Sequence, residues 1–135
     1  MIVDASVAFK WIVAEDDSER AIAWIDAAEL KAPHLLLAEV GNALGKRIRR
    51  GQFASPDGAG EQLGRLAQIV TIVDETPFIS RSLELALALD HSFYDCVYAA
   101  MAEARNEALL TADSVFAAKI VRAGLALSIK TLGTS

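Results

Sequence analysis

The chain has 135 residues, 53% hydrophobic but only 7% aromatic, so one α/β domain over residues 1–135 with a core of alanine and branched aliphatics is expected. Its 18 acidic and 13 basic residues give a formal net charge of −5, which excludes strong nucleic-acid affinity through bulk charge alone. The single cysteine, Cys96, excludes an intrachain disulfide, and the lack of a signal-peptide pattern or membrane-length apolar run predicts a cytoplasmic protein with no membrane contact.

The chain opens with a short apolar strand followed by helices. Residues 1–3 predict the strand, and either Asp4 or Ser6 can cap a helix over about residues 7–13. From Ser18 onward, apolar residues recur at helical spacing and predict a second helix with one face turned inward. These apolar residues are Ala21, Ile22, Trp24, Ile25 and Ala28.

A third helix carries an acidic residue in an apolar setting. It follows a short extended connection at residues 31–33, covers about residues 35–50 and ends at Gly51 as a left-handed cap. Glu39 lies among apolar and small residues, and a buried carboxylate costs free energy unless a positive group pairs with it. Glu39 is therefore a candidate cation ligand, with Asn42 on the same face; the alternative is a glutamate on the helix surface.

The densest basic cluster of the chain lies at the C-terminal end of this third helix. It comprises Lys46, Arg47, Arg49 and Arg50. Two interpretations stay open: a solvated helix end that is favourable against the helix dipole, or a local contact site for phosphate.

Helices and strands alternate through the middle and end of the chain. After a loop at residues 52–60, the pattern predicts a helix at about 57–67, a strand at 69–73 and a helix at 78–89. In the last of these, Leu83, Ala86 and Leu87 are expected to line one face. A helix over about 114–122 and a strand over 126–131 close the chain. The order favours a three-layer α/β/α sandwich around a parallel sheet of four to five strands.

Residues 91–114 predict a helix, a tight turn, a buried strand and an acidic residue just past the strand. Asp95 falls in the first turn of the helix, and Asp113 follows the strand as Asp4 follows the first one. Each can be explained as a helix-start residue. If the two strands are parallel, however, Asp4 and Asp113 emerge at the same carboxyl edge, where open α/β sheets bind ligands. His91 could assist acid–base chemistry beside Asp95 or make a local hydrogen bond.

The four acids form a hard-ligand set if they converge. Carboxylates without cysteine or histidine suit Mg²⁺ or Mn²⁺, and such ions activate water for attack on phosphodiesters. Without the metal, the clustered carboxylates would repel one another and at least one should have a raised pKa. The set is Asp4, Glu39, Asp95 and Asp113.

At these residues the sequence resembles the PIN-domain nucleases, and within them the VapC-type toxins of toxin–antitoxin pairs. The resemblance covers essentially the whole chain and rests on four short segments in order. They are residues 4–6 (Asp-Ala-Ser), 38–44 (Ala-Glu-Val-Gly-Asn-Ala-Leu), 94–103 (Tyr-Asp-Cys-Val-Tyr-Ala-Ala-Met-Ala-Glu) and 110–113 (Leu-Thr-Ala-Asp).

The resemblance implies a Mg²⁺- or Mn²⁺-dependent endoribonuclease, neutralised by a cognate antitoxin protein and usually a homodimer. The four acids would bind the metal, with Ser6 and Thr111 supporting them. The antitoxin would contact the early helices, on which the matching residues are Trp11, Ile12, Ile22 and Ile25. The chain departs from the family in one place: the basic residue often found soon after the last acid is absent until Lys119.

Two other functions compete with this one. A phospho-receiver signalling domain shares the parallel α/β fold, with Thr111 and Lys130 available, but it requires an adjacent acidic pair where the chain has Asp4-Ala5. A PIN-like subunit that binds RNA or a partner without cutting is the second alternative.

Overall fold

The strands of this protein are short, only two or three residues each, and all run parallel in one sheet. The computed structural model describes residues 1–53 and 57–133. Within these residues the strand order is β3-β2-β1-β4-β5. The strands are β1 (Ile2–Val3), β2 (Lys31–Pro33), β3 (Thr71–Val73), β4 (Leu109–Thr111) and β5 (Ile129–Thr131). The three central strands are the most buried, as expected for a parallel sheet covered on both faces.

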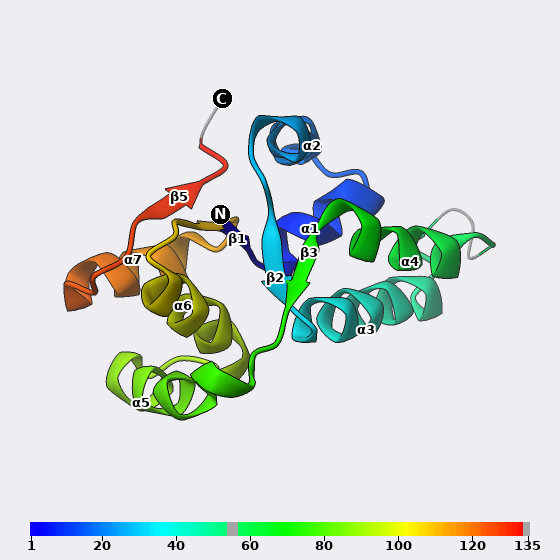
Figure 1. Ribbon diagram of the computed structural model, residues 1–135. Helices are drawn as coiled ribbons and strands as arrows, with labels where there is room; N and C mark the ends of the chain where they lie inside the picture. The colour runs from blue at the N-terminus through cyan, green and yellow to red at the C-terminus, as the bar shows by residue number, and fades with distance from the viewer. Residues whose placement is uncertain (54–56, 134–135) are drawn as a thin grey trace.

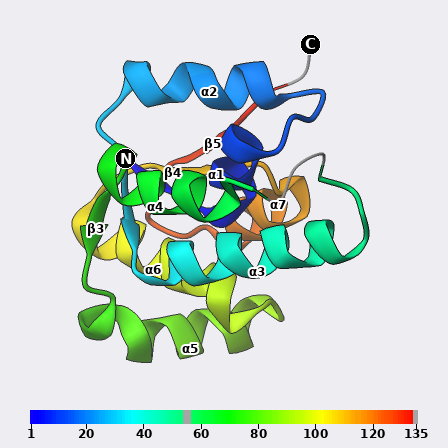
Figure 2. The same ribbon diagram turned by 90° about the vertical axis from the view of Figure 1, so that its right-hand side faces the viewer.

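Helices cover both faces of the sheet. They are α1 (Ala5–Ile12), α2 (Ser18–Ala27), α3 (Leu35–Arg49), α4 (Ala59–Ile69), the short 3-10 helix η1 (Thr76–Phe78), α5 (Ile79–Leu89), α6 (Phe93–Arg105) and α7 (Ser114–Ala123). Figure 1 shows α1, α3 and α4 on one side of the sheet and α5, α6 and α7 on the other. In Figure 2, α2 and α5 lie at opposite margins of the molecule. The expected three-layer α/β/α sandwich is confirmed.

The order of the strands places a topological switch point between β1 and β4. From β1 the chain builds outward through β2 to β3, and then returns to add β4 and β5 on the other side of β1. Val3 is in register with Leu110, and the Asp4 N–H donates to the Leu110 carbonyl at 3.1 Å. Ligands of open α/β sheets bind at such a point, outside the carboxyl ends of the strands.

The central helix of the α5–α7 layer is α6, and its middle is buried on all sides. Every residue from Cys96 to Ala102 is buried, including Tyr98 and Met101. Because α6 contacts β1, β2 and β4 while α5 covers its outer side, its first turn is held firmly at the carboxyl edge of the sheet. No helix of the described residues is long and apolar enough to cross a membrane.

The connection expected at residues 31–33 is in fact a strand of the sheet. β2 pairs with β1 on one side and β3 on the other. Three residues that include a lysine and a proline carry too little β pattern to be recognised, but the structure buries Ala32 and Pro33 between neighbouring strands.

Two of the three residues expected to line one face of α5 point away from the core. Leu83 and Leu87 are 55% and 77% exposed, whereas the buried residues of the helix are Ser82, Leu85 and Leu89. The Ser82 hydroxyl donates to the Phe78 carbonyl at 2.7 Å, so this small residue can lie inside and α5 can approach α6 closely. On α2 the inward face is only partly as expected, because Ala21 is buried but Ile22 is 48% exposed.

Several expected boundaries move by a few residues. α1 starts at Ala5 instead of residue 7, and the Asp4 side chain, not Ser6, caps it. Ile69, expected in a strand, ends α4, and β5 starts only at Ile129. Residues 54–56 of the expected loop lie outside the described residues.

Candidate metal centre

Three of the four candidate acids lie at helix N-termini that face the carboxyl edge of the sheet. Asp4 caps α1 by accepting from the Val7 N–H at 3.3 Å, and Asp113 caps α7 by accepting from the Phe116 N–H at 3.0 Å. Asp95 is in the first turn of α6. These acids are therefore helix-start residues, which was the local interpretation of the sequence. It also explains how carboxylates are tolerated here, because helix N-termini favour negative charge.

Asp95 links two overlapping groups of acidic side chains. Its carboxylate lies within 4.8 Å of ligand atoms of Asp113 and His91. Its charge also raises the pKa of both Asp4 and Glu39. The distance thus groups Asp95 with Asp113, and the pKa effects place Asp4, which follows β1, and Glu39 of α3 within electrostatic range of Asp95.

Asp4 is buried, with 4% of its surface exposed. Burial raises the pKa of its carboxyl to about 6, against the opposing effect of hydrogen bonds from Ser6, Thr111 and the Val7 N–H. The Ser6 hydroxyl donates to Asp4 Oδ1 and accepts from the Ala112 N–H at 2.9 Å. Ser6 thus connects the end of β1 with the end of β4.

Thr111, at the end of β4, also links the ends of the two strands. Its side chain is fully buried, and its Oγ1 accepts from the Asp113 N–H at 3.0 Å and lies 3.4 Å from Ser6 Oγ. Both hydroxyl residues that the sequence singled out are therefore within the site and contact the backbone or side chain of an acid.

Glu39 is half-buried on α3, and its Oε1 is buried without a hydrogen-bond partner in the described residues. Desolvation, together with the charges of Asp95 and Asp4, raises its pKa to about 7, against the opposing effect of the Tyr98 hydroxyl. That hydroxyl is also buried and lacks a well-aligned hydrogen bond. Glu39 lines a cavity of about 470 Å³ together with Asn42 and Tyr94, so Asn42 shares its face but is exposed.

Tyr98 was not identified from the sequence. It is completely buried, and its hydroxyl pKa is raised by burial and then by the charges of Glu39, Asp4 and Asp95. Its spacing of three residues from Asp95 on one helix face was the available indication. Without the fold, that spacing cannot be distinguished from ordinary core packing.

His91 makes the local hydrogen bond that was one of its two interpretations. Its Nε2 lies 2.7 Å from Asp95 Oδ2, and its ring stacks on Phe116 with 4.5 Å between centroids. Lys119, the first basic residue after Asp113, approaches the other ring nitrogen. The basic residue missing from the sequence pattern thus reaches this edge one helical turn later.

The basic cluster on α3 is only partly free. Arg47 pairs with Glu15 at 3.2 Å and lies over the Phe9 ring, 5.2 Å from its centroid. Lys46, Arg49 and Arg50 are exposed at the end of the helix. Both interpretations of the cluster stay possible for these three residues.

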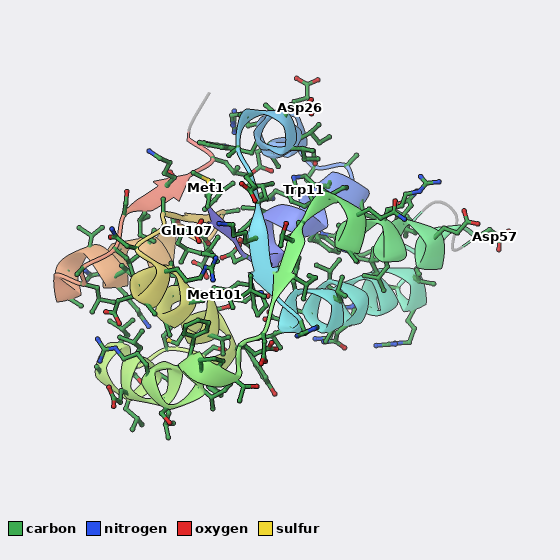
Figure 3. All side chains as sticks on the ribbon, in the orientation of Figure 1. Met1, Trp11, Asp26, Asp57, Met101 and Glu107 are labelled. Carbon is green, nitrogen blue, oxygen red and sulfur yellow. The ribbon has the colours of Figure 1, made fainter. Side chains whose placement is uncertain are left out.

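The apolar residues singled out for partner contact lie on α1 and α2. Trp11 lies on α1 (Figure 3), and its indole donates to the Ala21 carbonyl of α2 at 2.9 Å, which ties the two helices together. Trp11 and Ile12 also line a cavity of about 280 Å³ with residues of α4. Ile22 is exposed and Ile25 half-exposed on α2. The structure therefore places these residues on adjacent helices, partly accessible.

The chemistry of the acidic cluster fits a hard divalent cation. No lysine or arginine of the described residues forms a salt bridge with any of the four acids. The buried Glu39 Oε1 lacks a partner, and the carboxyl pKa values of Asp4 and Glu39 are raised. A cation of high charge density would satisfy this oxygen and reverse both shifts.

Comparisons with a family model and with known proteins agree on one protein family. The PIN domain family matches residues 1–120. Ribonuclease VapC9 of Mycobacterium tuberculosis is 35% identical over 115 residues, which cover 84% of this chain and 85% of that protein. Ribonuclease VapC3 of Pyrobaculum aerophilum is 31% identical over 122 residues, covering 88% of this chain and 93% of that protein.

Solved structures show the same architecture. The crystal structure of PAE2754 from Pyrobaculum aerophilum has a TM-score of 0.70 at 30% identity, covering 87% of this chain and 84% of that one. VapBC2 from Rickettsia felis, bound to a DNA fragment from its promoter, has a TM-score of 0.68 at 15% identity and covers 96% of both chains, which shows the fold alone. The phospho-receiver alternative is therefore set aside. The chain belongs to the PIN domain family and, within it, to the VapC type.

Proposed function

We propose that this protein is a Mg²⁺- or Mn²⁺-dependent endoribonuclease that acts as the toxin of a type II toxin–antitoxin module. The observation that carries the proposal is the meeting of Asp4, Glu39, Asp95 and Asp113 at the switch point without a lysine or arginine partner in the described residues. These four acids are proposed as metal-binding and catalytic residues. The ribonuclease names of the relatives support the choice of RNA as substrate.

The protein's own contribution to the chemistry is positioning. A divalent ion supplies Lewis-acid activation of water and of the scissile phosphoryl group. Ser6 fixes one oxygen of Asp4, and Thr111 holds the backbone that carries Asp113. Asn42 is proposed to support Glu39, because it lines the same cavity from the same face of α3. Without the ion, Glu39 would retain a proton in a large share of molecules near neutral pH, since its pKa is about 7, whereas Asp4, with a pKa of about 6, would be protonated mainly below neutral pH.

Two surfaces are proposed for macromolecular partners. The exposed Lys46, Arg49 and Arg50, with Arg47 beside them, would contact the RNA backbone, because they offer local positive charge on an acidic protein. Trp11, Ile12, Ile22 and Ile25 would contact a cognate antitoxin, because they offer partly accessible apolar side chains on the adjacent helices α1 and α2. We further propose that the protein is a homodimer and that it is located in the cytoplasm.

RNA cleavage by the purified protein tests the proposal. Structured RNA is incubated with Mg²⁺, with EDTA, and with Mg²⁺ and the Asp95→Asn variant. Cleavage is expected only with the unmodified protein and Mg²⁺. Equal cleavage in all three reactions would reveal a contaminating nuclease, and absence of cleavage in all three would favour the alternative of a subunit that binds without cutting.

A double variant tests the antitoxin surface separately. Replacing Trp11 and Ile22 by alanine should weaken binding of the co-expressed antitoxin while leaving cleavage of RNA intact. Leu87→Ala is the matched control, because Leu87 is a highly exposed leucine on α5, at the opposite margin of the molecule from α2 (Figure 2). Unchanged antitoxin affinity in the double variant would remove this surface from the proposal.

A further inference from the structure

We propose that Lys119 and His91 form a hydrogen-bonded chain that orients the Asp95 carboxylate, and that His91 acts as a positioning residue and not as a metal ligand. The metal part of this inference rests on the proposed function of Asp95. Its geometry does not, because every contact in the chain is present without the ion.

The chain starts at the end of α5. Lys119 of α7 donates from Nζ to the Asp90 carbonyl at 2.7 Å, and the same Nζ lies 3.2 Å from His91 Nδ1. A lysine ammonium group has donors and no acceptor. His91 Nδ1 must therefore accept, and it does not carry the ring proton.

The contact of the second ring nitrogen indicates the same position for the ring proton. His91 Nε2 lies 2.7 Å from Asp95 Oδ2, and an ionised carboxylate accepts hydrogen bonds only. Nε2 must therefore carry the proton and donate it. Both contacts are satisfied by one form of the ring, the neutral Nε2–H tautomer.

The ring is held in this orientation by packing as well. Only 13% of the His91 side chain is exposed, and the ring stacks on the fully buried Phe116 with an interplanar angle of 20°. Phe116 lies on α7, one turn before Lys119, so α7 supplies both the surface under the ring and the donor to Nδ1. A fixed ring leaves Asp95 Oδ2 in one place, which reduces the cost of assembling the site.

This arrangement explains why His91 lies near the acids without joining their ligand set. His91, Asp95 and Asp113 are close enough to hold one ion between them. In this tautomer, however, Nε2 is protonated and the Nδ1 lone pair accepts from the Lys119 ammonium group, so neither nitrogen has a free lone pair for a metal ion. Asp95 then remains a carboxylate ligand supported by a histidine.

Nitrogen-15 NMR of the two imidazole rings tests the chain in the metal-free protein. The sequence contains only one other histidine, His34, whose Nδ1 lies 3.1 Å from Glu75 Oε2 and which is 66% exposed. His91 should show its proton on Nε2 in slow exchange with water, whereas His34 should exchange quickly. Lys119→Met should speed exchange at His91 and leave His34 unchanged. A proton on Nδ1 of His91, or no response to Lys119→Met, would overturn the proposal.

Calorimetric titration with Mn²⁺ tests the consequence for the metal. His91→Gln keeps an N–H group near the Nε2 position, whereas His91→Phe keeps the stacked ring but removes the donor. We expect His91→Phe to weaken Mn²⁺ binding by roughly tenfold or more and His91→Gln to restore most of the affinity. Equal losses in both variants would mean that the imidazole itself is a ligand, against the proposal.

Two further measurements separate the possible failures. Lys119→Met should weaken Mn²⁺ binding less than His91→Phe does, and it replaces that variant if circular dichroism shows that His91→Phe does not fold. If the unmodified protein binds no Mn²⁺, the proposed metal function fails, while the NMR result still decides whether the hydrogen-bonded chain exists.

Discussion

Carboxylates at the two ends of the central strands β1 and β4 have opposite electrostatic surroundings. Met1 and Glu107 lie near each other at the amino end (Figure 3). Glu107 accepts from the Met1 ammonium group at 2.8 Å, from Lys31 at 3.0 Å and from Arg105 at 2.8 Å. Burial alone would raise its pKa, but these three partners lower the pKa to about 2. At the carboxyl end, none of the four acids pairs with a lysine, arginine or ammonium group of the described residues, and burial raises the pKa of Asp4 and Glu39.

This difference shows how each end of the strands affects the stability of the folded chain. A carboxylate surrounded by cations stabilises the folded chain, whereas clustered carboxylates without cations destabilise it unless a ligand compensates. Only about two residues of β1 separate the two environments, so the contrast does not come from depth in the sheet. It comes from which charged side chains the connections deliver to each edge. Such local instability is typical of functional sites.

The largest expected effect comes from Glu39→Gln at the carboxyl end. Removing this charge should lower Mg²⁺-dependent RNA cleavage by ~100-fold or more, because a preorganised electrostatic contact is lost. The metal-free protein should become more stable above pH 7, since an uncompensated charge disappears. Cleavage assays and urea unfolding measure the two outcomes. A loss of both activity and stability would mean that Glu39 is a structural residue.

The next effect is a pH dependence of opposite sign at the two ends. Because the folded pKa of Glu39 is raised from 4.5 to about 7, its contribution to stability is fully present below pH 4.5 and is lost as the pH rises through 7. For Glu107 the contribution is present above pH 4.5 and lost toward pH 2. Urea unfolding of the metal-free protein should show a fall of on the order of 2 kcal/mol from pH 5 to 8. Glu39→Gln should flatten this fall, and an unchanged slope would contradict the assignment.

A smaller effect is expected from Glu107→Gln, the matched substitution at the amino end. It should lower the free energy of unfolding by ~1.5 kcal/mol at pH 7, because three positive groups lose their shared partner. Cleavage and Mn²⁺ affinity should stay within error of the unmodified protein. A change in metal affinity would show that the two ends are coupled, and the comparison would then fail.

The smallest effect is stabilisation by the metal itself. Mg²⁺ at roughly five times its Kd should raise the free energy of unfolding by about 1 kcal/mol, because only the folded site binds it. Thermal unfolding with and without Mg²⁺ measures the shift. Glu107→Gln should retain the shift and Glu39→Gln should lose most of it. Equal shifts in both variants would indicate non-specific binding of the ion.

The sequence by itself determined the local position of each acid. Asp4 and Asp113 follow apolar strands and precede helices, and Asp95 falls in a first helical turn. Strand ends and helix starts depend on neighbouring residues, so spacing was sufficient to place these three acids, although several element bounds moved by a few residues. The enclosure of Glu39 by apolar residues could be read in the same way, and its half-buried position agrees with that prediction.

Only the tertiary structure decided which of these residues meet and what surrounds them. β2 exists because Lys31–Pro33 finds partners on two sides, and α5 turns Leu83 and Leu87 outward because Ser82 allows close packing on α6. The approach of Lys119 to His91, and of the Tyr98 hydroxyl to Glu39, likewise joins elements distant in the chain. These contacts depend on strand order and helix packing, which are properties of the whole fold and leave no local pattern in the sequence.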